Sequence, residues 1–205
     1  MSDLEEALAE ITAIRSHIAR SAEFRGYGPA TVSATGALAV VAADAQAWWM
    51  MNPASHVALY IALWTATAVL SITVIGIETI NRSRRVHSEL ANDMIRTAVE
   101  QFIPAGAAGV LLTGVLLRFA PEALWMLPGL WQIVFSLGVF ASCRFLPRWS
   151  YLVGVWYLSG GLVCLALANG EHAFSPWAMG LPFGIGQVLA AAVLRGNFPE
   201  SDGHF

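Results

Sequence analysis

The sequence predicts an all-α integral membrane protein with six transmembrane helices arranged as three hairpins. Hydrophobic residues make up 57% of the 205-residue chain and charged residues only 12%, which is too little charge for the surface of a soluble domain. The apolar residues gather in runs close to the ~20 residues that a helix needs to cross a bilayer. The stretch from Asn81 to Gln101 is the only long hydrophilic break among these runs.

The arginines predict how the chain is threaded. All 11 basic residues are arginine. If both termini are cytoplasmic, all of them except Arg118 face the cytoplasm, including Arg82, Arg84 and Arg85, and this bias requires an even number of spans. The absence of lysine excludes Schiff-base chemistry, and a net charge of -3 offers no basic surface to nucleic acid. The expected surroundings are a lipid bilayer, the bacterial inner membrane.

Residues 1–28 are expected to form a cytoplasmic amphipathic helix followed by a glycine–proline break. Ser2 and Glu5 have the spacing of a capping box. Because the first half of this helix is acidic, anionic lipid is a poor partner. The expected partner is a second copy, another cytoplasmic protein or the chain's own cytoplasmic loop. The apolar residues at heptad spacing that would make this contact are Leu4, Ile11, Ile14 and Ile18.

Residues 29–196 are expected to form the transmembrane domain. Short connections at Asn52–Ser55 and Pro121–Glu122 join neighbouring spans as hairpins. Apolar residues recur at every fourth position in segment 81–101, which predicts a cytoplasmic surface helix running into the third span. Residues 197–205 are expected to form a cytoplasmic tail. The six spans are expected at about 30–51, 56–77, 103–119, 123–145, 149–168 and 174–195.

The three hairpins show a short internal similarity that fits a triplicated unit. The second helices of two hairpins share a Leu-Pro pair followed by a glutamine, Gln132 or Gln187. Chance similarity between apolar helices is the alternative explanation. Each first helix carries a glycine followed after eight or nine residues by a polar residue, in the pairs Gly36 and Asp44, Gly109 and Arg118, and Gly161 and Asn169.

Asp44 is the most informative candidate for a functional site. A carboxylate within an apolar helix is costly unless it is paired, hydrated or protonated. Arg118 stands at the matching place in the second hairpin, so we expect a partly buried ion pair between them. The alternatives are that water reaches Asp44 at the outer edge of the membrane and that Arg118 extends to the headgroups.

Further polar and aromatic residues are candidates for a binding site in the outer half of the bundle. Trp64 and Trp131, like Trp156, lie deep within their spans, where they either pack in the core or against lipid, or line a pocket. Gln132 and Gln187 either join helices by hydrogen bonds or coordinate a polar substrate. Asn169 is a candidate by its place in the repeat.

A separate hypothesis places a metal site at the outer starts of the second helices. The residue types there include metal ligands, although histidines in loops are usually only solvated. No cofactor can be assigned from the sequence. Cys143 and Cys164 are expected near opposite ends of adjacent helices, too far apart for a disulfide. The metal candidates are His56, Glu122, Glu171 and His172.

Two functions fit these features. The first is a small transporter or channel-like binder of a small or cationic solute, because an intramembrane carboxylate, buried glutamines and proline–glycine interruptions are typical of a substrate path. The second is a non-catalytic membrane sensor or regulatory protein that acts through its cytoplasmic helices on a protein partner. The sequence has no hydrolase, metalloprotease, P-loop or zinc motif, so an enzyme is not expected.

Overall fold

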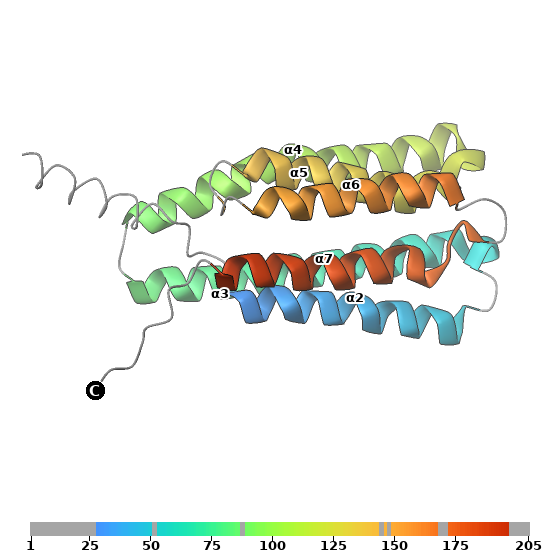
Figure 1. Cartoon of the computed structure of the whole chain (residues 1–205). Helices are drawn as coiled ribbons and strands as arrows, with labels where there is room; N and C mark the ends of the chain where they lie inside the picture. The colour runs from blue at the N-terminus through green and yellow to red at the C-terminus, as the bar shows by residue number, and fades with distance from the viewer. Residues whose placement is uncertain are drawn as a thin grey trace, which may run out of the picture.

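The computed structural model is an elongated bundle of helices, and its described part contains no strand (Figure 1). The structure describes residues 28–50, 53–86, 89–143, 146, 149–167 and 172–196, without the side chains of 54 and 82–98. The short 3-10 helices η1 (Pro53–His56) and η2 (Pro121–Met126) lie at one end, called the η end below. The long helices are α2 (Pro29–Trp49), α3 (Val57–Val86), α4 (Glu89–Phe119), α5 (Leu127–Ser142), α6 (Ser150–Leu167) and α7 (Pro176–Gly196).

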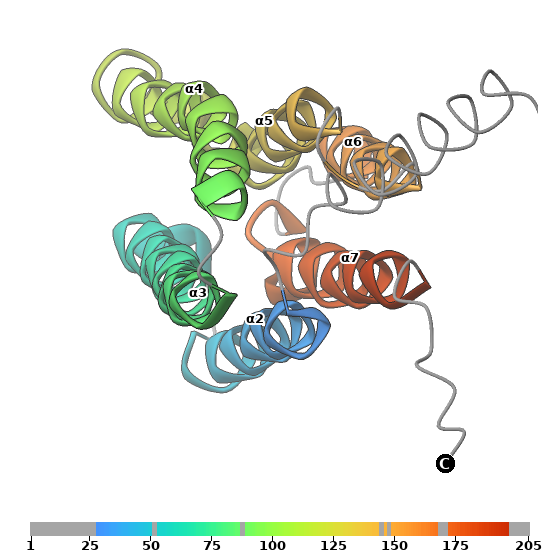
Figure 2. The same cartoon turned by 90° about the vertical axis from the view of Figure 1, so that its left-hand side faces the viewer.

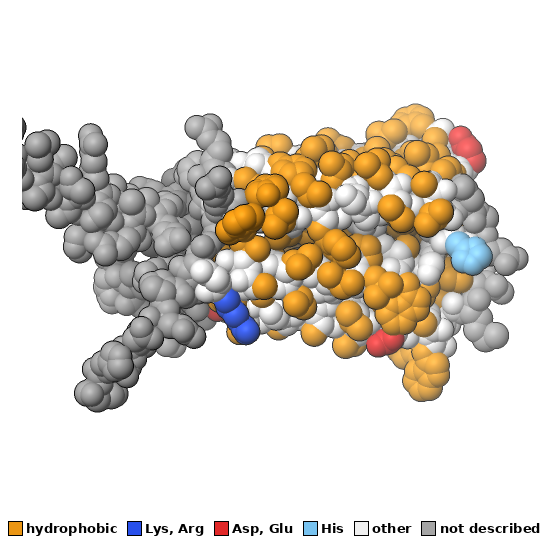
Figure 3. Space-filling model, viewed as in Figure 1, with side chains coloured by type: hydrophobic (Ala, Val, Ile, Leu, Met, Phe, Trp, Pro, Cys, Tyr) orange, Lys and Arg blue, Asp and Glu red, His pale blue; other side chains and the backbone are white. Residues whose placement is uncertain are grey.

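Several of these helices fit a membrane protein. Many apolar side chains are exposed along the face of the bundle seen in Figure 3, and Val110 of α4 is 74% exposed. Such a surface is stable in lipid but not in water. Helix α2, with 21 residues, is long enough but is not among the segments that are sufficiently apolar. The described part of the chain has five segments long and apolar enough to cross a membrane: Val57–Asn81, Val99–Phe119, Pro121–Ser142, Ser150–Leu167 and Pro176–Gly196.

Proline and glycine mark several helix boundaries. Pro29 and Pro176 open α2 and α7, where a missing backbone N–H costs nothing. Pro104 lies inside α4, which changes direction along its length (Figure 1), as expected where proline removes a helical hydrogen bond. At the start of α2, the Glu78 carboxylate of α3 packs directly against Gly28 and leaves no room for a Cβ atom. An anionic group is favourable at a helix N-terminus.

Viewed along its length, the bundle places helices that follow one another in sequence side by side, and α7 returns to α2 (Figure 2). The most extensive contacts are those of α2 with α7 and of α5 with α6, whereas α3 and α4 make few contacts with each other. The helices of each predicted hairpin also touch, but less extensively than these two pairs. The two helices of a predicted hairpin are therefore not the ones that pack most closely, contrary to what their short connections indicate.

Glycines explain why two helix pairs pack so closely. A Cβ atom added to Gly161 would lie 2.7 Å from the carbonyl oxygen of Gly129, and one added to Gly36 would lie 3.0 Å from that of Gly184. Without side chains between them, the backbones of α5 and α6, and of α2 and α7, can approach. At Gly109 of α4, a Cβ atom would meet only Val134, at 4.0 Å. The similar glycine in the second hairpin thus makes no such contact.

The three deep tryptophans join the two helices of each hairpin. Each one donates its indole N–H to an oxygen on the other helix of the same hairpin, which satisfies a polar group that lipid could not. Trp64 of α3 donates to Gln46 Oε1 of α2 at 2.8 Å, Trp131 of α5 to Thr113 Oγ1 of α4 at 2.9 Å, and Trp156 of α6 to the Pro182 carbonyl of α7 at 2.9 Å.

The predicted cytoplasmic elements are only partly within the described structure. Residues 89–98 are helical, but they form the first part of α4 and not a separate helix. Helices α3 and α4 extend beyond the other helices at the end opposite the η end (Figure 1). The predicted contact residues of the N-terminal helix, Leu4, Ile11, Ile14 and Ile18, and the side chains of Arg82, Arg84 and Arg85 lie outside the described residues.

Candidate functional site

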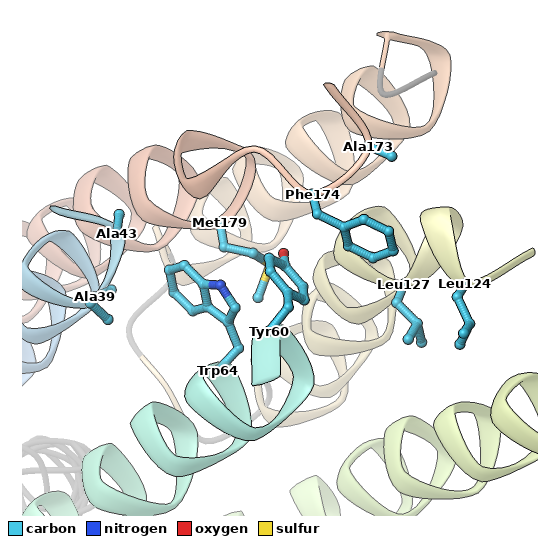
Figure 4. Packing of buried hydrophobic residues seen from close by; sticks show 10 residues of the cluster. Ala39, Ala43, Tyr60, Trp64, Leu124, Leu127, Ala173, Phe174 and Met179 are labelled. Carbon is cyan, nitrogen blue, oxygen red and sulfur yellow. The ribbon is translucent and has the colours of Figure 1, made fainter. Parts of the chain in front are cut away.

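A cluster of buried residues lies at the η end and brings together α2, α3, η2, α5 and the start of α7 (Figure 4). It includes large aromatic side chains, which line most small-molecule sites in proteins. We call it the η-end cluster. Its buried members are Ala39, Ala42, Ala43, Tyr60, Trp64, Leu124, Leu127, Ala173, Phe174 and Met179, and Trp131 is among the partly buried residues that pack against it.

Gln46 fixes the side of this cluster formed by α2. Its side chain is almost fully buried, its Nε2 donates to the Phe174 carbonyl at 2.8 Å, and its Oε1 accepts from Trp64 Nε1 at 2.8 Å. One amide therefore joins α2, α3 and the segment before α7. Gln46 was not among the residues predicted from the sequence, although a glutamine within an apolar helix is as strong a signal as Gln132 or Gln187.

Tyr60 is completely buried in the cluster, and its hydroxyl has no hydrogen-bond partner. Its ring packs edge-on against Phe174 with the centroids 5.0 Å apart. Figure 4 shows the hydroxyl directed from α3 toward α7. The thiol of Cys164 on α6 lies within electrostatic range of it. A buried hydroxyl without a partner costs roughly 1–3 kcal/mol, so this group is expensive for the fold to retain.

Gln132 of α5 is also completely buried and has one unsatisfied atom. Its Nε2 donates to the carbonyls of Ala178 at 2.9 Å and Pro128 at 3.1 Å and lies 4.0 Å from Met179 Sδ. These two carbonyl acceptors fix the orientation of the amide, since only its nitrogen can donate to them. The oxygen therefore points to the other side, where it faces Gly160 and has no hydrogen-bond partner.

Tyr157 of α6 repeats this situation deeper in the bundle. The side chain is completely buried, and its ring lies 4.6 Å from Phe135 and 5.0 Å from Phe183, measured between centroids. The hydroxyl faces Gln187 but does not reach hydrogen-bond geometry with it. Gly186 leaves the space for this hydroxyl, because a Cβ atom there would clash with it. Gln187 is half-buried, and its Cβ packs near Gly36 of α2.

The expected ion pair between Asp44 and Arg118 is not formed within the bundle. Both side chains are exposed, and no ion pair joins them in the part of the chain that the structure describes. Helix α3 lies between α2 and α4 (Figure 2). Because Ala43 and Gln46 face the interior of the bundle, Asp44 lies on the outward side of α2. The sequence showed that Asp44 is within a helix but not which way it faces.

The metal hypothesis receives no support from the described residues. His56, Glu122 and His172 are exposed at the η end. The described part of the chain contains no group of three His, Cys, Asp or Glu side chains that could hold a metal ion. Glu171 and Asn169 lie outside the described residues. Cys143 and Cys164 are both free thiols.

The η-end cluster holds one unsatisfied hydrogen-bonding atom among apolar side chains, the phenol oxygen of Tyr60, which can donate or accept. The amide oxygen of Gln132, which can only accept, lies outside the cluster on the side that faces Gly160. Another unsatisfied buried atom besides that of Tyr157 is Gln101 Oε1 in α4.

No protein-family model matches the chain, and no curated protein or solved structure is similar to it.

Proposed function

We propose that this protein binds a small, uncharged, hydrogen-bonding solute in the η-end cluster and conducts it across a membrane. The observation that carries the proposal is the pair of fully buried atoms without partners, Tyr60 Oη and Gln132 Oε1. Met179 belongs to the cluster that contains Tyr60 and also contacts Gln132. A fold that keeps two such atoms gives up stability, and a bound solute would restore their hydrogen bonds.

The surroundings favour a neutral solute over the cationic one considered from the sequence. Asp44 faces away from the interior, so it offers no counter-charge to a bound cation. A bare ion buried among aromatic rings would lose its hydration without compensation. Tyr60, Trp64 and Phe174 supply apolar walls. Gln132, whose amide nitrogen contacts Met179 of the cluster, carries a second unsatisfied acceptor on the side that faces Gly160. This combination fits molecules such as glycerol or urea.

The position of Tyr157 extends the site into a route. Phe183 packs against the η-end cluster, and the ring of Tyr157 lies 5.0 Å from the ring of Phe183 between centroids. The unsatisfied hydroxyl of Tyr157 would be a second binding position for the solute, with Gln187 beside it. Helix α3, which carries Tyr60 and Trp64, makes few contacts with α4. It is the helix whose movement would open the cluster at least cost.

Osmotic swelling of proteoliposomes tests the proposal. The wild-type protein should increase the entry rates of glycerol and urea, followed by light scattering, above those of protein-free liposomes, and should leave sodium entry unchanged. The double variant Tyr60→Phe/Gln132→Leu should lower the rates to those of protein-free liposomes. Tyr151→Phe, at an exposed tyrosine of α6, is the matched control and should keep the wild-type rates. Equal rates with and without the wild-type protein would contradict the proposal.

A second candidate function, a sensor or regulator, is favoured by the extensions of α3 and α4. These helices continue beyond the other helices at the end opposite the η end (Figure 1), where a partner protein could bind them. Spin labels at positions 84 and 93 would report the separation of the two extensions. A distance that changes when glycerol or urea is added supports a signal from the η-end cluster, and an unchanged distance opposes it.

A further inference from the structure

We propose that the outward faces of α2 and α4 form an interface between two copies of this chain, with Asp44 of one copy paired to Arg118 of the next. The two residues do not meet within one chain, because α3 lies between their helices (Figure 2). Both are exposed, they carry opposite charges, and both lie near the end of a helix that runs toward the η end.

Asp44 is poorly placed for a residue that faces lipid. It lies five residues before Trp49, the last residue of α2, which is about 7.5 Å along the helix axis. Trp48 and Trp49 are 84% and 82% exposed, as expected for side chains at the membrane interface. Asp44 therefore lies closer to the centre of the membrane than this aromatic belt.

Arg118 is an arginine at the same end of the bundle as Asp44. The described residues of the connections at this end, 50, 53–56, 120–126 and 172–175, include neither arginine nor lysine. The Arg118 guanidinium lies 5.6 Å from the centroid of the neighbouring Phe119 ring. Such a contact leaves its N–H donors free for a carboxylate. Since the Asp44 of its own chain is on another side of the bundle, an Asp44 that pairs with Arg118 belongs to a second copy.

The helix surfaces around the two charges can approach each other closely. A Cβ atom added to Gly106 or Gly114 would meet nothing within 4 Å. An exposed glycine costs a helix about 1 kcal/mol relative to alanine, and close approach by another helix is its usual role in membranes. The outward residues of α2 at spacings of three and four are Ala30, Ala34, Ala37, Val41, Asp44 and Trp48, and those of α4 are Ala107, Leu111, Gly114 and Arg118.

The interface also explains the lower hydropathy of α2. Helix α2 is not among the segments apolar enough to cross a membrane by themselves, and a neighbouring copy would cover its outward face. Because the two surfaces differ, the interface is heterologous, and copies with equal orientation in one membrane form a ring when the rotation between neighbours closes. Assembly of this ring does not depend on solute binding, since the two surfaces lie outside the η-end cluster.

Disulfide cross-linking in membranes tests the interface. In a Cys143→Ala/Cys164→Ala background, Ala37→Cys and Leu111→Cys stand seven residues before Asp44 and Arg118. Membranes that contain both variants should give a cross-linked dimer, and membranes with either variant alone should give none. A dimer from one variant alone, or no dimer from the mixture, would overturn the proposal.

Charge reversal in the same assay tests the ion pair. Asp44→Arg or Arg118→Asp alone should lower the yield of cross-linked dimer by about tenfold, equivalent to ~1.4 kcal/mol, and both together should restore it. Glu122→Arg, an exposed residue of η2 at the same end, is the matched control and should leave the yield unchanged. Failure of the double variant to recover, while thermal unfolding shows it to be folded, would exclude the pair.

Discussion

Trp64 donates its indole N–H to Gln46 Oε1 over 2.8 Å, and this bond connects α3 to α2 where the η-end cluster begins. The same glutamine donates to the Phe174 carbonyl, so its two polar groups hold three segments in place. The amide is almost fully buried, and the residues that carry its partners, Trp64 and Phe174, are also buried. The geometry of the cluster therefore depends on Gln46.

Gln46→Leu should destabilise the protein by roughly 1–3 kcal/mol, because the Trp64 N–H and the Phe174 carbonyl would both lose a buried partner. Thermal or denaturant unfolding in detergent would measure the change. Thr73→Val removes an exposed hydroxyl of α3 that bonds within its own helix, and it should change stability by less than about 0.5 kcal/mol. Equal effects of the two substitutions would show that Gln46 holds nothing in place.

Gly36→Ala should destabilise the bundle by about 1–3 kcal/mol, because the added methyl group would meet Gln187 Cβ at 2.8 Å and the Gly184 carbonyl at 3.0 Å. The backbone of α7 cannot give way without separating from α2. Gly76→Ala in α3, where a Cβ atom meets nothing within 4 Å, should instead stabilise by up to about 1 kcal/mol. Unfolding curves of the two variants would measure these opposite changes in stability. A stability change of the same sign in both variants would contradict the close packing of α2 and α7.

Cys143 should react slowly with iodoacetamide at neutral pH. It follows the last residue of α5, and burial raises the pKa of its thiol. A raised pKa means that less of the reactive thiolate is present at a given pH than in an ordinary cysteine, whose pKa is about 8.5. The labelling rate should therefore keep rising above that pH. Measurement in a Cys164→Ala variant isolates this thiol. A labelling rate whose pH midpoint lies at or below that of a free cysteine would refute the prediction.

Much of the fold could be predicted from the sequence, because long apolar runs and proline–glycine breaks determine where helices begin and end. Each of the six predicted apolar segments corresponds to a helix, and five segments of the described chain are apolar enough to span a membrane. The rotation of α2 about its axis was not predictable. Its alanines lie on both faces, with Ala37 exposed and Ala39 buried, so hydrophobic periodicity did not show that Asp44 faces outward.

The candidate site was predicted only in part. Trp64, Trp131 and Gln132 were identified by their depth or polarity, but which helices they connect depends on packing that no short sequence pattern encodes. Tyr60 was missed, because a tyrosine near a helix start usually extends to the membrane interface. Here the closely packed bundle buries it completely.

Tyr60→Phe tests the proposed role of the unpaired atoms most directly when stability and solute entry are measured on the same preparation. Removing a buried hydroxyl without a partner should leave the free energy of unfolding unchanged or raise it by about 1–2 kcal/mol. The same variant should lose most of the glycerol or urea entry of the wild-type protein, because the solute loses its hydrogen bond. Wild-type entry rates in a correctly folded Tyr60→Phe protein would contradict a solute site at this hydroxyl.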